Sequence, residues 1–312
     1  MKKWVQGAKM QQPSDSSKKT VIYTAWVFLL LASTIPMIVL QEVFHQPVSG
    51  DLRSGMAAIV LLIGLALTYA WSAVRPLRPF FILFLLLAGA EWFVFTKIDQ
   101  LPFYQAWLKN PSFNIFMLAE QSLRLMVTLV MIGVLFILKK RRESFFLAKG
   151  DTSARLEPVK WLGIKEGERW NKTGWVLAIF ISLGTLTFLV LAGRPPLDIA
   201  IKAMPFLPAI LLAAALNAFN EEMTYKASFL AVLEEPLGSH QSLWLMAAYF
   251  GLGHYYGVPY GIIGVLMAGF LGWLLGKSML ETRGLWWAWF IHFLQDVMIF
   301  AFLAIGSITP GG

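Results

Sequence analysis

Five side chains that could do chemistry stand inside the most apolar part of the chain. Glu221 and Glu222 lie in "NAFNEEMTYKASFL", His254 in "YFGLGHYYG", and His292 and Asp296 in "WFIHFLQDVMIF". An ionisable group in an apolar span costs about 2.5–3.5 kcal/mol on insertion scales, so each one requires a reason. A carboxylate beside an imidazole can hold and deprotonate a water molecule. A second imidazole can donate to a developing oxyanion. Together these groups have the chemistry to hydrolyse an amide.

A metal site is the alternative use of the same residue types, since glutamate and histidine are common zinc ligands. The HExxH spacing of the zincins is absent, and the chain has no cysteine to serve as a thiol nucleophile or a thiolate ligand. A zincin is therefore not expected, although the same residues could still bind a divalent metal. No P-loop and no Gly-rich dinucleotide fingerprint is present, and we expect no cofactor.

The spacing of these residues places them on shared helix faces. Asp296 follows His292 by four residues, and Phe250 precedes His254 by four. Around the glutamates, a polar stripe and a second i,i+4 pair stand on an apolar helix: Asn217, Glu221, Thr224 and Ser228, and Glu222 with Lys226. Any one of these residues alone is more simply explained by helix packing. Their combination predicts one buried site.

The depths of the three predicted helices agree with a shared site. At about 1.5 Å per residue, Glu221 lies roughly 18–20 Å from the cytoplasmic end of its helix and His254 about 18 Å from its own. His292 and Asp296 lie about 11 and 17 Å from theirs. The estimate puts the site on the cytoplasmic side of the bilayer or near its middle.

The elements that must position these groups are transmembrane helices. The chain of 312 residues is 57% hydrophobic and 14% charged, with a mean hydropathy of +0.64, whereas soluble domains are about 25% charged. Continuous rather than alternating apolar runs favour helices over a barrel. We predict an all-α, polytopic transmembrane helical bundle of about nine spans, near 21–41, 56–74, 79–96, 113–138, 173–193, 203–233, 242–258, 261–279 and 285–305.

The lysines and arginines predict the orientation, because short cytoplasmic segments are enriched in them. The N-terminus carries five lysines by residue 19, and the segment 139–172 carries ten basic residues. We expect the N-terminus and this segment in the cytoplasm, the C-terminus outside, and a bacterial cytoplasmic membrane as the location. The net charge of +8 is then a topology signal and an attraction to anionic lipid of the bilayer. No basic helix or aromatic platform indicates binding to nucleic acid.

The polar segment 139–172 divides the chain into three parts. Residues 1–138 form a four-span region of unknown role, 139–172 a basic cytoplasmic loop, and 173–312 a C-terminal membrane region. In the first part, Glu120 and Arg124 are predicted to form an i,i+4 ion pair that fixes helix packing, with a substrate contact as the alternative. Glu91 is interpreted as reaching the outer interface.

The helix near 261–279 is expected to pack closely beside the site. Ala268, Gly272 and Gly276 recur at four-residue spacing, and small residues at this spacing let helix backbones approach. Unremarkable filler of a membrane helix is the alternative for these glycines.

The motifs together resemble a known family. Glu221-Glu222-x-x-x-Lys226, Phe250-x-x-x-His254 and His292-x-x-x-Asp296 are similar to the successive motifs of the CPBP intramembrane proteases, also called the Abi or CAAX-protease-and-bacteriocin-processing family, which includes the type II CAAX prenyl endopeptidases. The resemblance covers about 205–305. It implies a metal-free, glutamate-dependent endopeptidase in which Glu221 and His254 activate water. His292 with Asp296 would stabilise the oxyanion, and Glu222 would orient the site.

One position departs from the family pattern. Lys226 stands where the first motif usually ends in arginine, whose planar fork holds a carboxylate differently from the point charge of lysine. The exchange is compatible with an enzyme acting on a membrane-associated or prenylated protein or peptide. It is also compatible with a non-cleaving scaffold, immunity or regulatory protein that binds a partner. A transporter or channel with a proton relay is the third reading, although no inverted repeat is visible. The substrate and the oligomeric state are not predicted.

Overall fold

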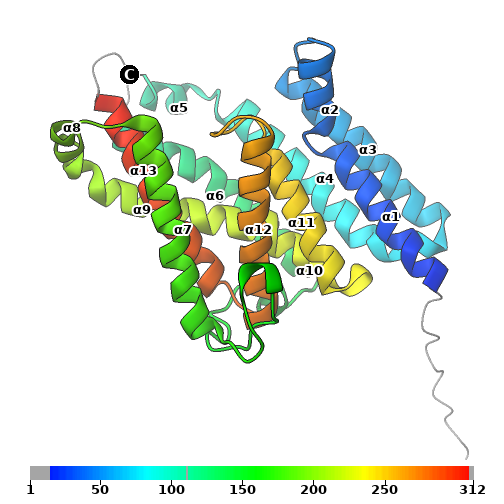
Figure 1. The fold of residues 1–312 in the computed structure, drawn as a ribbon. Coiled ribbons are helices and arrows are strands. Elements are labelled where there is room, and N and C mark those ends of the chain that lie inside the picture. The colour runs from blue at the N-terminus through cyan, green and yellow to red at the C-terminus, as the bar shows by residue number, and fades with distance from the viewer. Residues whose placement is uncertain (1–14, 110–111, 309–312) are drawn as a thin grey trace, which may run out of the picture.

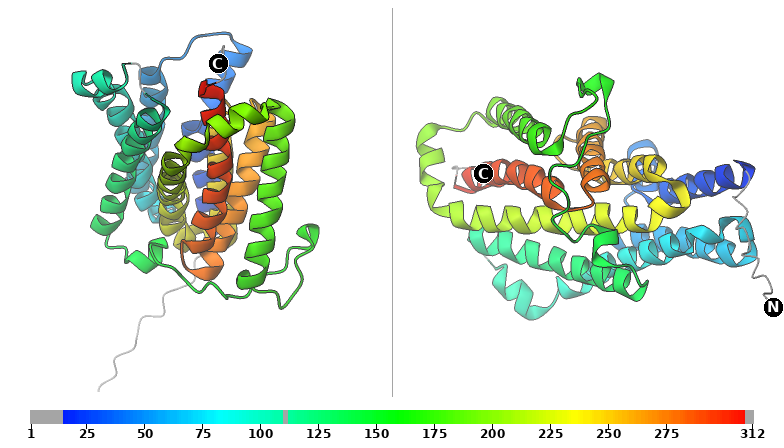
Figure 2. Two further views of the ribbon diagram at one scale, coloured as in Figure 1. Left: turned by 90° about the vertical axis from the view of Figure 1, so that its left-hand side faces the viewer. Right: turned by 90° about the horizontal axis from the view of Figure 1, so that it is seen from below.

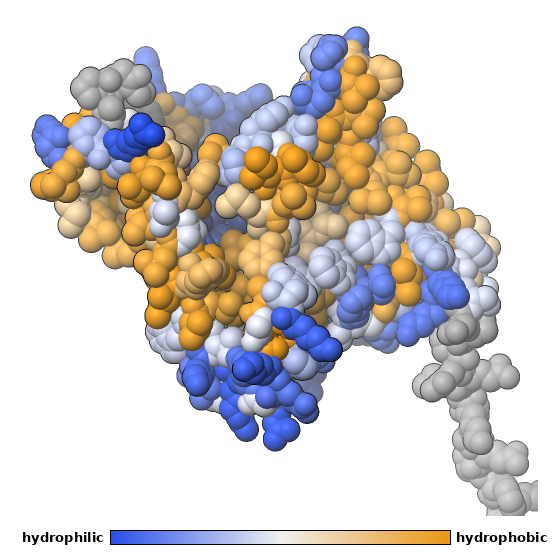
Figure 3. Space-filling model, in the orientation of Figure 1, coloured by the Kyte–Doolittle hydropathy of each residue, from blue (hydrophilic) through white to orange (hydrophobic). Residues whose placement is uncertain are grey.

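The computed structural model describes residues 15–109 and 112–308. The described residues form helices joined by mostly short connections, and no strand is found among them. Seven helices are long and apolar enough to cross a membrane by length and composition, or eight if the bent pair at the N-terminus counts as one span. An apolar band separates two hydrophilic ends of the molecule on the face drawn in Figure 3. The all-α polytopic bundle is confirmed.

The N-terminal region forms a layer of four helical spans. They are α1 (Asp15–Ala32), which bends by 45° into α2 (Ile35–Ile38) and the π-helical η1 (Val39–Val43), then α3 (Gly50–Ala70), α4 (Arg78–Phe93) and α6 (Phe113–Ile137). Shorter segments are η2 (Ser72–Leu77), η3 (Val94–Ile98) and α5 (Pro102–Trp107). Phenylalanine rings of α4 fill the interior of this layer, and Phe84 also meets Phe229 and Tyr249 of the C-terminal region. One main core therefore runs through both regions.

The C-terminal region surrounds a long, steeply tilted helical run. After α7 (Trp170–Gly193), the run Leu197–Leu237 contains α8 (Leu197–Lys202), η6 (Met204–Phe206), α9 (Leu207–Glu221), η7 (Glu222–Ala227) and α10 (Ser228–Leu237). At 1.5 Å per residue these 41 residues measure about 60 Å, twice the roughly 30 Å of a bilayer core. The run crosses the molecule obliquely (Figure 1) and traverses it when seen from below (Figure 2).

Three further helices complete the bundle: α11 (Ser239–Gly253), α12 (Ile262–Thr282) and α13 (Trp286–Ile308). Gly238, with φ of 81°, makes the turn between α10 and α11. The predicted count of about nine spans exceeds that of the structure by α11, for which a span of 242–258 was expected. This helix has only 15 residues and ends at Gly253, so it measures about 22 Å.

The basic segment between α6 and α7 is folded against the ends of the spans. It contains two 3-10 turns, η4 (Arg142–Phe145) and η5 (Lys160–Leu162), and two isolated β-bridges. Phe145 and Phe146 are fully buried, and Trp287 of α13 donates to the carbonyl oxygen of Thr152 at 3.0 Å. The segment therefore caps one end of the bundle.

The small-residue stripe of α12 packs against α11, as the sequence predicts. A Cβ added to Gly272 would lie 2.9 Å from the ring of Phe250. The closest backbone approach involves Gly251, where an added Cβ would lie 2.6 Å from the carbonyl oxygen of Val265 and 2.9 Å from Cα of Gly269. Since real Cβ atoms do not approach backbone so closely, the two helices require glycine at this crossing.

We expect Gly251→Ala to destabilise the protein, because the new methyl group meets rigid backbone and must separate α11 from α12. Overpacking of this kind costs about 1–3 kcal/mol. Thermal unfolding of the purified protein in detergent measures the effect. Gly133→Ala is the matched control, because an added Cβ there has open space. Equal stability of the Gly251 variant and the control would contradict the tight crossing.

Candidate active site

The two adjacent glutamates stand where the long helical run changes its winding. Glu221 is the last residue of α9, and Glu222 is the first residue of the π-helical η7. A π-helical turn contains more residues than an α-helical one and is frequent at functional sites. Glu221 keeps 14% of its side chain exposed, whereas the side chain of Glu222 is fully buried. The neighbouring carboxylates thus occupy different environments.

Glu222 is held by one cation and one imidazole. Its Oε1 lies 2.7 Å from Nζ of Lys226 and 2.7 Å from Nδ1 of His292. The side chain of Lys226 is fully buried, and its ammonium also lies 3.4 Å from the ring centroid of Phe250. Lysine therefore occupies the position of the family's arginine with one carboxylate and one aromatic face as partners.

His292 connects Glu222 to the other acidic groups. Its Nε2 lies 3.7 Å from Oε2 of Glu221 and 3.6 Å from Oδ2 of Asp296. The amide nitrogen of Asn217 donates to Asp296 at 3.0 Å and to Glu221 at 3.4 Å. Residues from α9, η7 and α13 thus form one buried polar network.

His254 stands at the end of α11, on the other side of Glu221. Its Nδ1 lies 2.8 Å from the carbonyl oxygen of Phe250. A carbonyl oxygen only accepts, so Nδ1 carries the hydrogen and donates. In the neutral ring, Nε2 is then left as an acceptor. The rings of Phe250 and His254 lie 4.6 Å apart, which fixes the orientation of the imidazole.

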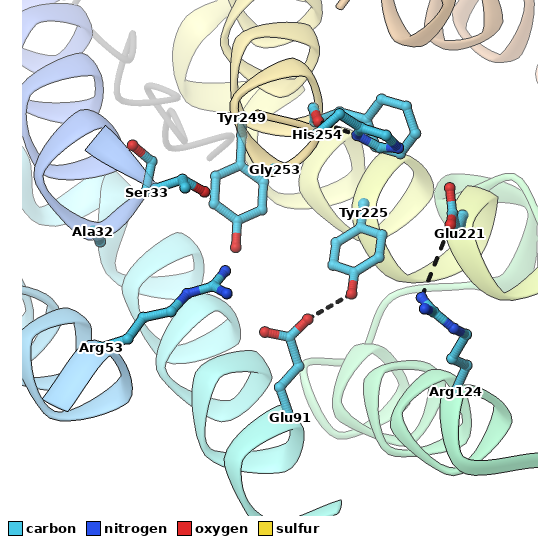
Figure 4. A pocket seen from close by; sticks show the side chains of 12 residues that line it. Ala32, Ser33, Arg53, Glu91, Arg124, Glu221, Tyr225, Tyr249, Gly253 and His254 are labelled. Carbon is cyan, nitrogen blue, oxygen red and sulfur yellow. Dashed lines mark hydrogen bonds and ion pairs between the residues drawn. The ribbon is translucent and has the colours of Figure 1, made fainter. Parts of the chain in front are cut away.

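A polar cavity of about 260 Å³ brings Glu221 and His254 together. Figure 4 shows both side chains on its wall. His292 and Asp296 are not among the lining residues, which are Ala32, Ser33, Thr34, Arg53, Glu91, Arg124, Glu221, Tyr225, Tyr249, Phe250, Gly253 and His254. The cavity is large enough for water and for part of a peptide.

The N-terminal helices supply polar residues to this cavity. The sequence alone does not single out Arg53, places Glu91 at the interface, and indicates a substrate contact for Arg124 only as an alternative. Nη1 of Arg124 lies 4.0 Å from Glu221, rather than pairing with Glu120 as predicted. Glu91 does not simply reach the interface, because the hydroxyl of Tyr225 donates to it at 2.5 Å. Arg53 of α3 completes the wall (Figure 4). The sequence contained a signal for these residues, because a charged residue within a membrane span is a candidate functional residue.

Two sequence-based expectations require correction. The stripe from Asn217 to Ser228 does not share one face, because the π-helical turn shifts the later residues and Thr224 contacts Thr128 of α6 at 2.9 Å. The depth estimate changes for His254, which follows the last residue of α11 and lies about 22 Å from the start of that helix rather than about 18 Å. His292 lies about 9 Å into α13, close to the roughly 11 Å expected.

In the part of the chain that the structure describes, no group of three or more histidine, aspartate or glutamate side chains is arranged to hold a metal ion. Glu221, His254 and His292 belong to one region without converging on one point. The expectation of a metal-free site remains a prediction.

A bundle of apolar helices around a buried glutamate and histidine network, open to a polar cavity, defines an integral membrane protein with an enzyme-like site. Residues 203–298 match the family described as type II CAAX prenyl endopeptidase Rce1-like. The general class that the match supports is a peptide-bond hydrolase. No curated protein and no solved structure matches the chain.

We expect Lys226→Met to destabilise the fold strongly, because it leaves the buried Glu222 carboxylate without its cation. Breaking a buried pair from one side costs about 3–5 kcal/mol. The free energy of unfolding, measured in detergent, should recover in large part in the double variant Glu222→Gln/Lys226→Met, which removes both charges. Lys226→Arg keeps the charge and is the conservative control. A single Lys226→Met variant as stable as the unaltered protein would contradict the pairing.

Proposed function

We propose that the protein is an intramembrane endopeptidase that hydrolyses a peptide bond of a membrane-associated protein or peptide with water activated by Glu221. The observation that carries the proposal is the position of this carboxylate. It belongs to the buried network through Asn217 and His292, yet it faces the cavity that it shares with His254. The Rce1-like match over 203–298 supports the same class of reaction.

Water held between Glu221 and Nε2 of His254 is the nucleophile in this mechanism. Glu221 accepts a proton as the water oxygen attacks the carbonyl carbon of the substrate. When the carbon–nitrogen bond of the tetrahedral intermediate breaks, the same carboxyl group returns the proton to the leaving amine. The products are a carboxylate and a free amino terminus, so atoms and protons balance without a cofactor.

His292 supplies the donor for the oxyanion. His292 does not itself line the cavity, but its Nε2 is 3.7 Å from Glu221, so the carbonyl oxygen must enter beside Glu221 to accept from it. Asp296 at 3.6 Å and Glu222 at 2.7 Å hold the two ring nitrogens. Preorganised donors of this kind contribute about 10²–10³-fold to the rate. In this role Glu222 and Lys226 are positioning residues.

We expect Glu221→Gln to reduce cleavage by about 10²–10⁴-fold, because the amide cannot accept the proton from water. His254→Ala and His292→Ala should also lose most activity. The measurement is mass spectrometry of membrane-tethered peptides after incubation with the purified, folded protein. Glu235→Gln is the matched control, since its side chain is 87% exposed and contacts only Lys140 at 3.7 Å.

The non-cleaving scaffold predicts a different result. A cellular phenotype would then survive alanine at Glu221 and at His254, and only changes that disturb packing or a partner surface would have an effect. Cleavage that stops on chelation and returns with stoichiometric zinc would instead overturn the glutamate mechanism in favour of a metal.

We expect Arg124→Gln to lower cleavage by about tenfold without unfolding the protein. Its guanidinium lies 4.0 Å from Glu221. The Coulomb interaction of two opposite charges at this distance is about 1 kcal/mol in bulk water and about 4 kcal/mol near a protein surface. The rate of peptide cleavage measures the effect, and Glu120→Gln, on the same helix, is the control. Equal rates of these two variants would remove Arg124 from the site.

A further inference from the structure

Part of the cavity wall lies near one end of the helices, whereas Arg124, Glu221 and Tyr225 stand midway along α6 and the long helical run. Ala32 and Ser33 stand at the end of α1, Arg53 in the first turn of α3, and Gly253 at the end of α11. The chain runs up through α1, returns through α3, and runs up again through α11 (Figure 1). These positions therefore share one face of the molecule, opposite the capping segment between α6 and α7.

Some lining residues near this face are more exposed than Glu221, although Arg124 beside Glu221 keeps 38% of its side chain exposed. Arg53 and Gly253 are exposed, Ser33 is half-buried, and Glu221 keeps 14% of its side chain exposed. Beyond Glu221, the side chains of Glu222 and Lys226 are fully buried. The exposed Arg53 and Gly253 therefore mark a mouth at the end remote from the basic segment. Glu222 and Lys226 do not line the cavity but lie buried behind Glu221, and we call this buried pair its floor.

The charges on the two faces differ. Connections on the face of the capping segment (71–77, 138–169, 238 and 283–285) contain eleven lysines and arginines: Arg75, nine within 138–169, and Arg283. Described connections and short helices on the opposite face (44–49, 94–109, 194–206 and 254–261) contain four: Lys97, Lys109, Arg194 and Lys202. Basic connections stay in the cytoplasm. The charge asymmetry therefore assigns the mouth of the cavity to the outer face.

We propose that the cavity opens to the extracytoplasmic side, and that its substrate is a peptide segment presented there, such as an exported peptide or the outer end of a membrane protein. The substrate class rests on the proposed peptidase function, whereas the direction of access does not. A substrate anchored on the cytoplasmic face would have to pass the closed floor of Glu222 and Lys226. The same geometry argues against a cytoplasmic lipidated chain end as the substrate.

The absence of cysteine makes single-cysteine labelling a clean test. Ser33→Cys reports on the cavity, Val258→Cys on the exposed connection beside its mouth, and Glu166→Cys on the basic segment; Val258 is 92% exposed and Glu166 is exposed. Intact cells that express each full-length variant are treated with a small, membrane-impermeant thiol reagent. The same treatment follows after permeabilisation, with the cysteine-free protein as background.

We expect labelling of Ser33→Cys and Val258→Cys in intact cells, and of Glu166→Cys only after permeabilisation. The reverse pattern would overturn the orientation. In a second contrary outcome, Val258→Cys is labelled in intact cells, whereas Ser33→Cys is labelled only after permeabilisation or is never labelled. This result would overturn access to the cavity from the outer side. Labelling does not require cleavage, so the two proposals are tested separately. The cleavage assay can contradict the peptidase while the labelling supports outer access, and the labelling can contradict outer access while cleavage is observed.

Discussion

The burial of three ionisable side chains at one point governs the rest of the structure. Nζ of Lys226 and Nδ1 of His292 each lie 2.7 Å from the same carboxylate oxygen, Oε1 of Glu222. Each of these groups would be expensive alone in an apolar environment, since removing one partner leaves an uncompensated charge. Their mutual neutralisation requires η7 and α13 to meet at this place. The ring of Phe250 against the ammonium adds α11 to the same constraint.

The two adjacent glutamates have different roles: Glu222 holds the buried network together, and Glu221 is the proposed reactive group. The π-helical turn after Glu221 allows two adjacent carboxylates to point into different surroundings, one into the sealed network and the other toward the cavity. Oε1 of Glu222 has two partners at 2.7 Å, while Glu221 has weaker contacts at 3.4 Å or more with Asn217, His292 and Arg124. A carboxylate with loose partners can accept a proton and return it. The network thus positions the Glu221 carboxylate and leaves its oxygens able to accept a proton.

Much of this could be predicted from the sequence, and the remainder depended on geometry between helices. The apolar runs predicted the helical bundle, and i,i+4 spacing placed His292 with Asp296 and Glu222 with Lys226 on shared helix faces. That separate helices bring Glu221, His254 and His292 together was predicted from their estimated depths. The partner of Arg124 could not be predicted, because Glu120 on its own helix and Glu221 on another are both compatible with the pattern. The stripe through Thr224 failed because α-helical periodicity does not hold across a π-helical turn. The end of α11 was also missed, since the apolar sequence continues past Gly253.

The shortness of α11 has a consequence for how water reaches the site. This helix measures about 22 Å, whereas a bilayer core measures about 30 Å. Seven of its 15 residues are buried against neighbouring helices, and His254, directly after its last residue, lines the polar cavity. The imidazole therefore stops short of the full thickness of a bilayer core, and the cavity extends along the remaining distance. Water then reaches Glu221 along polar groups of the protein and does not have to cross the lipid.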